Sequence, residues 1–487
     1  MVGRIREMIM NPHVLMVCLL LFTNVCAAQL IFRNDFGPPD IDPLFPEIGG
    51  VIQLPDEPAA NQLQWILDQL AANDTSIQDI NDHFSDNWLA GIDANATRNF
   101  IQAVRNDYPN AKIIDLTGLT SMEANVLIQG QDNQANTAIL SLSTYYSGTA
   151  KINSFGVNFH NGNLQYPEDM NLTLSQAIDK FATLSIDSGL LIAYINDNDE
   201  CEIIDENNAS LLKATGSLFK PWILGGFAKK LDDMSMSLNQ NIEYVVSERV
   251  FNTSPVHLEP FGTMFKAIDV ATLMLGNSDN TATDLLHEEV GRATIDQYIS
   301  ESGVSDPDVL SPLLSVNEQF HVFFSFPLLT AETFVNDSEA NQLDFINDQI
   351  VPLGPVSSFP HNNVSLLTQG SWRASPMDVC ANMAKLRTYP KNSDASIAIN
   401  RAYGAQAAQF RVRPEWDRVW YKGGSLIGGG SGYHVLTHAW LLENNGQWPI
   451  VLVAMANNDN GGIDADLGIF KIQSVLSRIL ELLAEGI

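Results

Sequence analysis

A serine and a lysine three residues apart, Ser217 and Lys220, are the first candidates for nucleophilic chemistry in this sequence. On a helix this spacing places the hydroxyl and the amine on one face, so the amine can take the hydroxyl proton and leave an oxygen nucleophile. At neutral pH this step requires the lysine pKa to fall from its usual value of about 10.4, through burial or a neighbouring cation. The alternative interpretation of such an isolated pair is a solvated helix face, because the pattern is common by chance.

Pro221 indicates where the helix that carries this pair begins. Proline has no backbone N–H and is tolerated only in the first helical turn, so the helix is predicted to begin at about Ser217. The Ser217 hydroxyl would then lie at a helix N-terminus, where the helix dipole favours developing negative charge.

Two further short motifs follow along the chain. The segment Asn277 to Asn280 (Asn-Ser-Asp-Asn) comes after a predicted helix, and the segment Tyr421 to Ser425 (Tyr-Lys-Gly-Gly-Ser) ends a predicted strand. Read singly, the first is a turn or a helix cap and the second is a glycine-rich hairpin turn. The three motifs together, in this order and each on the element that its chemistry needs, indicate one catalytic site.

From about Leu172 onward the chain resembles the class A serine β-lactamase and penicillin-binding-protein superfamily, whose three motifs match Ser217–Lys220, Ser278–Asn280 and Lys422–Ser425. With the unit that precedes them, the chain is most similar to the β-lactamase-like proteins of the clavulanate-pathway type, which add an N-terminal isomerase/cyclase-like domain. The resemblance implies an α/β two-lobed, transpeptidase-like domain in which an antiparallel sheet with helices meets a helical lobe. A small α+β cone-like domain would precede it.

The resemblance also implies a role for each motif residue. Ser217 would be the acylated nucleophile and Lys220 its activating amine. Ser278 would relay a proton to the leaving group, while Lys422 would lower the pKa of Lys220 by its charge and attract an anionic substrate. Backbone N–H groups of Ser217 and Ser425 would form an oxyanion hole, a contribution of roughly 3–4 kcal/mol per donor. The residues expected to bind substrate are Asn280, Gly424, Ser425 and Arg373.

Two departures from the family pattern bear on the expected activity. Gly423 stands where the family usually has a threonine that helps to hold a substrate carboxylate, so Ser425 or Arg373 would have to substitute for it. The glutamate loop with which efficient class A enzymes activate the deacylating water has no counterpart after the second motif. Glu318 is the nearest glutamate, but Ser315 three residues before it predicts a capping box at a helix start. Without a dedicated base, hydrolysis of a stable acyl-enzyme is expected to be slow.

Other hydrolase plans fit the sequence less well. The segment Gly429 to Tyr433 breaks the Gly-x-Ser-x-Gly pattern of a nucleophile elbow at its last position. His434 and His438 share a strand face, but two histidines without a nearby carboxylate or third histidine favour a structural pair over a metal site. We therefore expect neither a metal nor a cofactor.

The charge and the N-terminal segment bear on partners and location. The 26 basic and 57 acidic residues give a net charge of −31, which disfavours nucleic acid as a partner. Residues 1–28 combine early arginines, an apolar stretch and a small-residue end, the pattern of a signal peptide, and the apolar run is shorter than the roughly 20 residues of a membrane span. An exported protein, periplasmic or secreted, with no stable membrane span is therefore expected. Lipid attachment at Cys18 or Cys26 is a minor alternative.

After removal of such a signal two cysteines remain, Cys201 and Cys380. An even number permits one disulfide in an oxidising compartment. The spacing alone does not decide between a disulfide and two buried thiols.

The chain length of 487 residues predicts two folded units. Residues 29–58, rich in proline, aspartate and glycine, are expected to form a linker, and residues 59–165 combine helical stretches with alternating strands into an α+β accessory unit. Residues 166–487 form the catalytic unit, where strands near both ends, with helices between them, predict a sheet whose edges come from distant sequence. Within it, the apolar residues from Met264 to Leu275 recur at helical spacing and predict one helix.

These features predict an exported serine hydrolase that forms an acyl-enzyme at Ser217 with β-lactam, ester or amide substrates and deacylates slowly. Two alternatives stay open. One is a D-Ala-D-Ala peptidase that acts on cell wall, and the other is a binding or sensor module that acylates once without turnover. The expected partner is a small-molecule β-lactam or ester, or a peptide.

Overall fold

The computed structural model describes residues 41, 44–48, 51–131, 137–160, 162–251, 255–428, 432–459, 463 and 468–486. The signal peptide predicted for residues 1–28 lies outside the described residues, as do residues 29–40 of the predicted linker and residues 429–431 of the broken elbow pattern. Within the described ranges, every helix is too short or too polar to span a bilayer.

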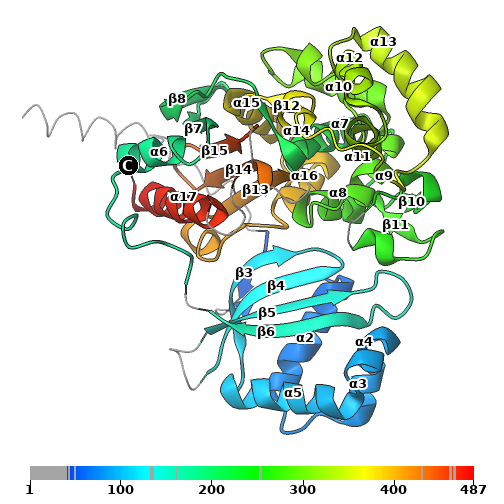
Figure 1. Ribbon diagram of the computed structural model, residues 1–487. Helices are drawn as coiled ribbons and strands as arrows, with labels where there is room; N and C mark the ends of the chain where they lie inside the picture. The colour runs from blue at the N-terminus through cyan, green and yellow to red at the C-terminus, as the bar shows by residue number, and fades with distance from the viewer. Residues whose placement is uncertain are drawn as a thin grey trace, which may run out of the picture.

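The N-terminal unit is an antiparallel sheet of four strands in the order β3-β4-β5-β6, with four helices on one face (Figure 1). Three of these helices begin at side-chain caps, Ser76, Ser85 and Asp93, which bind otherwise unpaired backbone N–H groups. Strand β5 alternates buried and half-exposed residues, because one face of the sheet packs on the helices. The elements are α2 (Pro58–Ala71), α3 (Ile77–His83), α4 (Asp86–Gly91), α5 (Ala94–Asp107), β3 (Lys112–Leu119), β4 (Glu123–Gln129), β5 (Thr137–Thr144) and β6 (Ile152–Phe159).

The described part of the predicted linker has structure of its own. Strands β1 (Glu47–Ile48) and β2 (Val51–Ile52) form a short antiparallel hairpin, and Phe45, Ile52 and Leu54 pack against the core of the N-terminal unit. Helix α2 then begins with Pro58 in its first turn, which its missing N–H permits.

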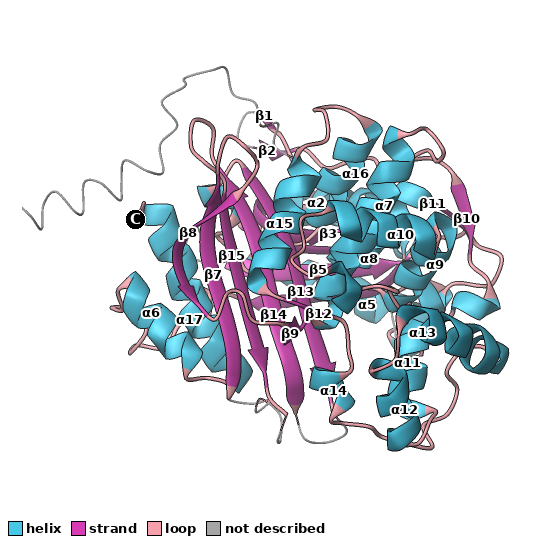
Figure 2. Ribbon diagram, turned by 90° about the horizontal axis from the view of Figure 1, so that it is seen from above, coloured by secondary structure: helices cyan, strands magenta, loops and turns pink. Residues whose placement is uncertain are grey.

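The C-terminal unit, named the catalytic unit after its predicted role, is built on a five-stranded antiparallel sheet in the order β13-β14-β15-β7-β8 (Figure 2). The central pair joins β15 to β7, so early and late segments of the unit meet in one sheet, as the sequence predicted. Helices α6 and α17 cover one face, and the helical lobe covers the other (Figure 2). The elements are α6 (Leu174–Ala182), β7 (Asp187–Ile195), β8 (Cys201–Asn207), β13 (Arg418–Ile427), β14 (Tyr433–Glu443), β15 (Ile450–Asn457) and α17 (Gly468–Glu485).

Both faces of this sheet are buried, which explains the near-continuous apolar run of β7. Leu190 and Ile192 face the core under α6 and α17, whereas Leu191 and Ala193 face the core of the helical lobe. Successive strand residues point to opposite faces, so a strand covered on both sides has no polar face to alternate with.

The helical lobe lies between β8 and β13 in the sequence. The helix predicted from Met264 to Leu275 was wrong at its N-terminal end. Met264 lies on strand β11 and is about half exposed, and helix α8 begins only at Ala267. Met264 pairs with Glu243 of strand β10, and this pairing overrides the apolar periodicity. The elements are η1 (Gly216–Phe219), α7 (Lys220–Asp232), β10 (Asn241–Glu243), η2 (Val246–Glu248), η3 (Val256–Leu258), β11 (Met264–Lys266), α8 (Ala267–Gly276), α9 (Asn280–Val290), α10 (Arg292–Glu301), η4 (Pro307–Val309), α15 (Pro376–Arg387), α16 (Asp394–Tyr403) and η7 (Arg413–Glu415).

A group of short helices between α10 and α15 has a small core of its own. Val322, Phe323, Phe334, Ile350 and Leu366 are buried together there, apart from the two large cores of the sheet. The elements are α11 (Val316–Phe324), α12 (Leu328–Val335), α13 (Glu339–Phe345), η5 (Ile346–Ile350), η6 (Val351–Leu353) and α14 (Leu366–Gln369). The two-stranded ribbon of β9 (Lys213–Ala214) and β12 (Arg373–Ala374) then joins the lobe to the sheet.

The two units are in direct contact. The backbone of strand β3 bonds to the segment after α16, through Leu119 N–H to Ala405 O at 2.9 Å and Ala407 N–H to Thr117 O at 2.8 Å. Met122, in the turn between β3 and β4, is 1% exposed and belongs to the core of the catalytic unit. Burial of such a side chain stabilises by roughly 1.5–3 kcal/mol, so the interface is part of the folded state rather than a loose contact.

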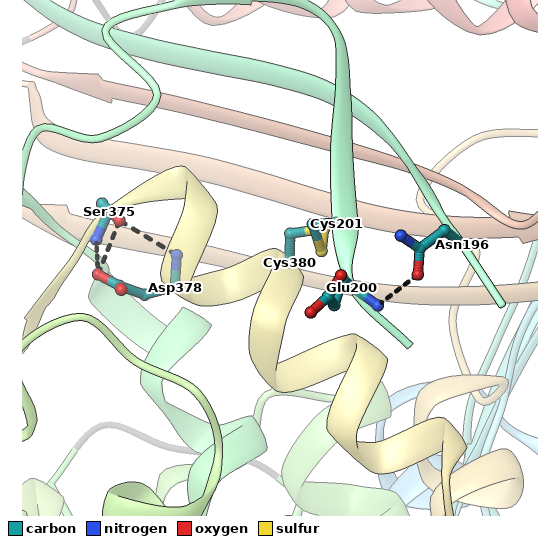
Figure 3. The surroundings of a disulfide bond; sticks show 6 residues. All are labelled: Asn196, Glu200, Cys201, Ser375, Asp378 and Cys380. Atoms are coloured by element: carbon teal, nitrogen blue, oxygen red, sulfur yellow. Dashed lines mark hydrogen bonds between the residues drawn. A yellow bond between two sulfur atoms is a disulfide. The ribbon is translucent and has the colours of Figure 1, made fainter. Parts of the chain in front are cut away.

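Cys201 and Cys380 form a disulfide, which resolves the alternative that the sequence left open (Figure 3). It joins the first residue of the edge strand β8 to helix α15, with 6.3 Å between the two Cα atoms. Helix α15 starts nearby with a capping box between Ser375 and Asp378 (Figure 3). The bond thus ties the sheet edge to a helix of the opposite lobe.

Candidate functional site

Ser217 lies in the short 3₁₀ turn η1, and α7 continues directly from it at Lys220. Pro221 occupies the first turn of α7, as predicted from its missing N–H. Gly216 has a φ of 52°, and a Cβ there would lie 2.7 Å from the backbone N of Ser425. Only glycine fits this conformation and this approach, which brings the turn holding Ser217 against strand β13.

Lys220 is fully buried, and its ammonium group has three oxygen partners. Its Nζ donates to Ser278 O at 2.6 Å, to Ser278 Oγ at 3.3 Å and to Asn280 Oδ1 at 2.8 Å. Burial lowers the pKa of Lys220, while the charges of Asp279 and Asp284 oppose this shift. The lowered pKa is what a lysine needs in order to act as a base near neutral pH.

Ser278 lies in a short loop that joins helices α8 and α9, and it adopts a φ of 54°. The next residue, Asp279, caps α9: its carboxylate accepts hydrogen bonds from Ala282 N–H and Val256 N–H, both at 2.9 Å. A residue other than glycine adopts the left-handed region only at an energetic cost, so its surroundings must hold Ser278 there. The hydrogen bonds of Asp279 fix the next residue of the loop in the same way.

Lys422, on β13, completes the cluster from the sheet side. Its Nζ donates to Ser278 Oγ at 2.9 Å and to Gly423 O at 2.6 Å, and its side chain is buried. Burial and then the charge of Lys220 hold the pKa of Lys422 well below its usual range. For Lys220, burial is the cause that lowers the pKa, one of the two causes expected from the sequence, and the effect expected from the charge of Lys422 stays a prediction.

Gly424 and Ser425 bring strand β13 close to η1, the turn that holds Ser217. A Cβ at Gly424 would lie 2.3 Å from Thr215 O and 2.7 Å from the backbone N of Ser217, so any larger residue would push the two segments apart. The Thr437 hydroxyl donates to Thr215 O at 2.8 Å and fixes this approach. The backbone N of Ser217 thus lies at the edge of β13 beside Gly424 and Ser425, where an oxyanion hole was predicted.

At Gly423, where the family usually has a threonine, the structure leaves no space for a side chain. A Cβ at Gly423 would lie 2.3 Å from the hydroxyl oxygen of Tyr421, so that hydroxyl fills the space a side chain would need. Tyr421 Oη is 2.8 Å from Nδ1 of His438, whose ring stacks on Trp440. The sequence did not assign Tyr421 a role, although its position two residues before Gly423 places both on one strand face.

Arg373 is the predicted substrate residue that the structure does not join to the cluster. It lies on β12 opposite Ala214. None of the hydrogen bonds or ion pairs between described residues links Arg373 to the two lysines or to Ser278, and its buried Nε has no partner there. Its role in carboxylate recognition stays a prediction.

Glu318 is confirmed as part of a helix cap. With Ser315 it forms a capping box at the start of α11, and its carboxylate binds Arg292 at 2.6 and 2.8 Å. Burial raises the pKa of Glu318, but the charges of Arg292 and His287, with the hydrogen bonds from Arg292 and Ser315, together outweigh it and leave the pKa lowered. A carboxylate bound in this way is a weak acceptor of protons from water.

Asp284 is a buried group near the cluster that the sequence reasoning missed. It lies on α9, and its two oxygens accept hydrogen bonds from Val316 N–H at 2.7 Å and Asn317 N–H at 2.8 Å. It thereby joins α9 to the N-terminus of α11, and its charge acts on Lys220. The available signal was its spacing of four residues from Asn280, which puts both on one helix face.

Two family models match the chain in separate segments. Residues 173–342 match the model described as the beta-lactamase enzyme family, and residues 54–148 match the one described as the ORF 12 gene product N-terminal. No curated protein matches the sequence. The first match confirms the resemblance predicted from the motifs, and the second shows that the preceding α+β unit is a recognised domain.

Solved structures that match part of the chain include β-lactamases and a protein described as PBP-A. A beta-lactamase from Chitinophaga pinensis DSM 2588 is 17% identical with a TM-score of 0.43 and covers 64% of this chain and 98% of its own. A class A representative from Bacteroides cellulosilyticus DSM 14838 is 16% identical, with a TM-score of 0.42 over 65% and 100%. A protein described as PBP-A is 13% identical, with a TM-score of 0.40 over 63% and 95%.

Proposed function

We propose that the catalytic unit, which has a β-lactamase-like fold, is a serine hydrolase that transfers an acyl group from a β-lactam, ester or amide to Ser217. The observation that carries this proposal is the hydrogen-bonded chain from Lys220 through Ser278 Oγ to Lys422. It gathers two amines and a hydroxyl, all able to move protons, in one cluster. Lys220 of this cluster lies one helical turn after Ser217, and Lys422 lies on the strand whose Gly424 approaches the backbone N of Ser217.

In the proposed first step the neutral amine of Lys220 takes the Ser217 hydroxyl proton as Oγ bonds to the carbonyl carbon of the substrate. Negative charge moves to the carbonyl oxygen, which backbone N–H groups of Ser217 and Ser425 stabilise. When the tetrahedral intermediate collapses, the bond from the carbonyl carbon to the leaving nitrogen or oxygen breaks. The proton passes from Lys220 through the Ser278 hydroxyl to that leaving atom.

The two buried lysines support this proton transfer electrostatically. A positive charge on either lysine disfavours protonation of the other, because both side chains hydrogen bond to Ser278 Oγ and both are removed from water. A doubly protonated pair is therefore costly, and one amine is readily left free to act as a base. An anionic group on the substrate would favour protonation of Lys422 and leave Lys220 as the base.

Deacylation is the slow step in this proposal. Glu318 is held by its cap and by Arg292, so it is not available to activate a water. Esters and peptides whose acyl-enzymes admit water would turn over, whereas a stable penicilloyl ester would persist. The same observation favours the second candidate, a module that acylates once and does not turn over.

Acylation is tested by incubating the protein with a fluorescent penicillin and a panel of activated esters and weighing it intact. We expect one adduct per chain, located on Ser217 by peptide mapping and absent from the Ser217→Ala variant. The exposed Ser235 provides a matched control, since Ser235→Ala should acylate normally. If no probe forms an adduct with the unmodified protein, the proposal is wrong.

Turnover separates the candidates. Repeated hydrolysis of an ester, lost in Ser217→Ala, would exclude the single-acylation module. Release of D-alanine from a peptide ending in D-Ala-D-Ala would instead identify a peptidase, and its absence would exclude that activity.

We propose further that the protein is exported. The signal-peptide pattern of residues 1–28 supports this, and the Cys201–Cys380 disulfide is of a kind that persists in oxidising compartments. Fractionation of cells that express the full chain, with N-terminal sequencing of the product, is the test. A full-length product in the cytoplasm would contradict export.

A further inference from the structure

The turn between β3 and β4 of the N-terminal unit is inserted beside the loop that carries Ser278. Thr120 in this turn lies close to Gly276: a Cβ added at Gly276 would be 2.7 Å from Thr120 Cγ2. Gly276 is the last residue of α8, and Asn277 and Ser278 follow it directly. The N-terminal unit therefore contacts the helix end from which the catalytic loop starts.

Glu123, the first residue of β4, makes the polar contact at this point. Its Oε2 accepts a hydrogen bond from Asn277 Nδ2 at 2.5 Å. Asn277 is the C-terminal cap of α8, where its own N–H binds Leu273 O, and its Oδ1 is buried without a hydrogen-bond partner among the described atoms. Among the described residues, the bond to Glu123 is therefore the hydrogen bond that this side chain makes.

The hydrogen bond between Glu123 and Asn277 helps to fix Ser278, the next residue in the chain. Ser278 holds a left-handed backbone conformation, and its carbonyl and hydroxyl both accept hydrogen bonds from Lys220. A small rotation of the Asn277 backbone would turn the Ser278 carbonyl and hydroxyl away from the lysines. Positioning of this kind matters for catalysis, because misplacement by about 1 Å can cost on the order of 100-fold in rate.

We propose that Glu123 is a positioning residue for acyl transfer, which holds the Ser278 loop through Asn277, so that the N-terminal unit completes the catalytic site. This inference rests on the proposed function, since it concerns the same acylation of Ser217. It assigns the N-terminal unit a role in the reaction itself, beyond its contribution to folding.

The ionisation of Glu123 gives this role a signature. Burial and the nearby charge of Asp279 raise the pKa of Glu123 to about 7, although the bond from Asn277 opposes the shift. Asp279, in the α8–α9 loop, acts on Glu123 by its charge and is itself acted on by Lys220, while Arg401, the arginine of α16, is paired with Glu57. Above pH 7 the carboxylate therefore holds Asn277 by a charge-assisted bond, and below it the weaker neutral acid does so.

The experiment measures the acylation rate of Ser217 from pH 5.5 to 8.5 in the full chain and in Glu123→Gln and Glu123→Ala. For Glu123→Ala we expect a fall of about 10-fold or more at pH 8, the effect of losing one hydrogen bond to a charged group. For Glu123→Gln, which keeps a neutral acceptor, the ratio of wild-type to variant rate should be near one at low pH and increase through pH 7. Asn277→Ala should match Glu123→Ala, and the double variant should be no slower.

Glu57→Gln is the matched control, because Glu57 also crosses the interface as a carboxylate but binds Arg401 instead of the catalytic loop. It should leave the acylation rate unchanged at every pH. Acylation of Glu123→Gln at the wild-type rate throughout, or a constant ratio across the pH range, would overturn the inference. An unreactive wild-type protein would instead refute the proposed function, so the two failures are distinct. Should Glu123→Ala not fold, Glu123→Gln and Asn277→Ala still decide the outcome.

Discussion

Gly423 offers a sharp test of the strand that carries Lys422, because the family's usual residue can be put back there. In the Gly423→Thr variant the new Cβ would lie 2.3 Å from Tyr421 Oη and 3.3 Å from Thr437 O. The first distance is impossible for a real side chain, so the tyrosine ring or the strand must move. Such overpacking costs roughly 1–3 kcal/mol in the free energy of unfolding.

The structure also predicts how that cost is relieved. Tyr421→Phe removes the clashing oxygen and leaves the ring carbon Cζ at 3.1 Å as the nearest atom. By itself Tyr421→Phe should destabilise the protein by about 1–3 kcal/mol, since His438 Nδ1 loses its partner in a buried place. In the Tyr421→Phe background, however, the threonine should cost at least about 1 kcal/mol less than it does alone.

Denaturant unfolding measures these differences, followed by tryptophan fluorescence, to which the buried Trp420 and Trp440 beside the substituted strand contribute. Gly156→Thr is the control, because Gly156 lies on strand β6 and no atom lies within 4 Å of a Cβ placed there. Its free energy of unfolding should change by less than about 0.5 kcal/mol. If Gly423→Thr were as stable as the wild type, or if the two substitutions were simply additive, the close contact described between Tyr421 and Gly423 would be wrong.

Three further outcomes follow from the site and its supports. Lys220→Met should abolish acylation, while Lys229→Met, at a partly exposed position of α7 paired with Glu301, should leave it intact. In the wild type the rate should rise with pH as Lys220 loses its proton, and a rate that falls with pH would contradict Lys220 as the base. Glu318→Gln should lower stability by about 1–3 kcal/mol through its lost ion pair and cap but leave deacylation unchanged, whereas slower deacylation would identify Glu318 as the missing base. Cys380→Ser should destabilise by about 2–5 kcal/mol in chemical unfolding, and no change would mean that the disulfide is absent in solution.

The local features of the site could be predicted from sequence because each depends on neighbouring residues. Pro221 placed the first helical turn correctly, although Ser217 itself lies in a 3₁₀ turn and the α-helix begins only at Lys220. The capping box of Glu318 followed from its spacing to Ser315. The motif order led to the family resemblance, which the match over residues 173–342 confirms. These are short-range rules of helix geometry and motif spacing.

What the sequence could not provide depends on contacts between distant segments. Glu123 meets Asn277 across 154 positions, and no local pattern marks a carboxylate that will face another unit. The exposed position of Met264 followed from pairing with β10, which overrode a convincing helical period. The disulfide likewise needed the approach of β8 to α15, 179 residues apart, before it could be assigned.

The pairing of β15 with β7 also has a consequence for biosynthesis. Ser217, Lys220 and Ser278 are all made well before β13, β14 and β15, yet Lys422 and the strands that enclose the cluster come only with those late segments. A nascent chain that has just completed the helical lobe therefore holds a serine and a lysine that no buried environment has yet activated. On the proposed mechanism, Ser217 would become a reactive nucleophile only when the last strands dock, so the growing chain would not be acylated before the fold is complete.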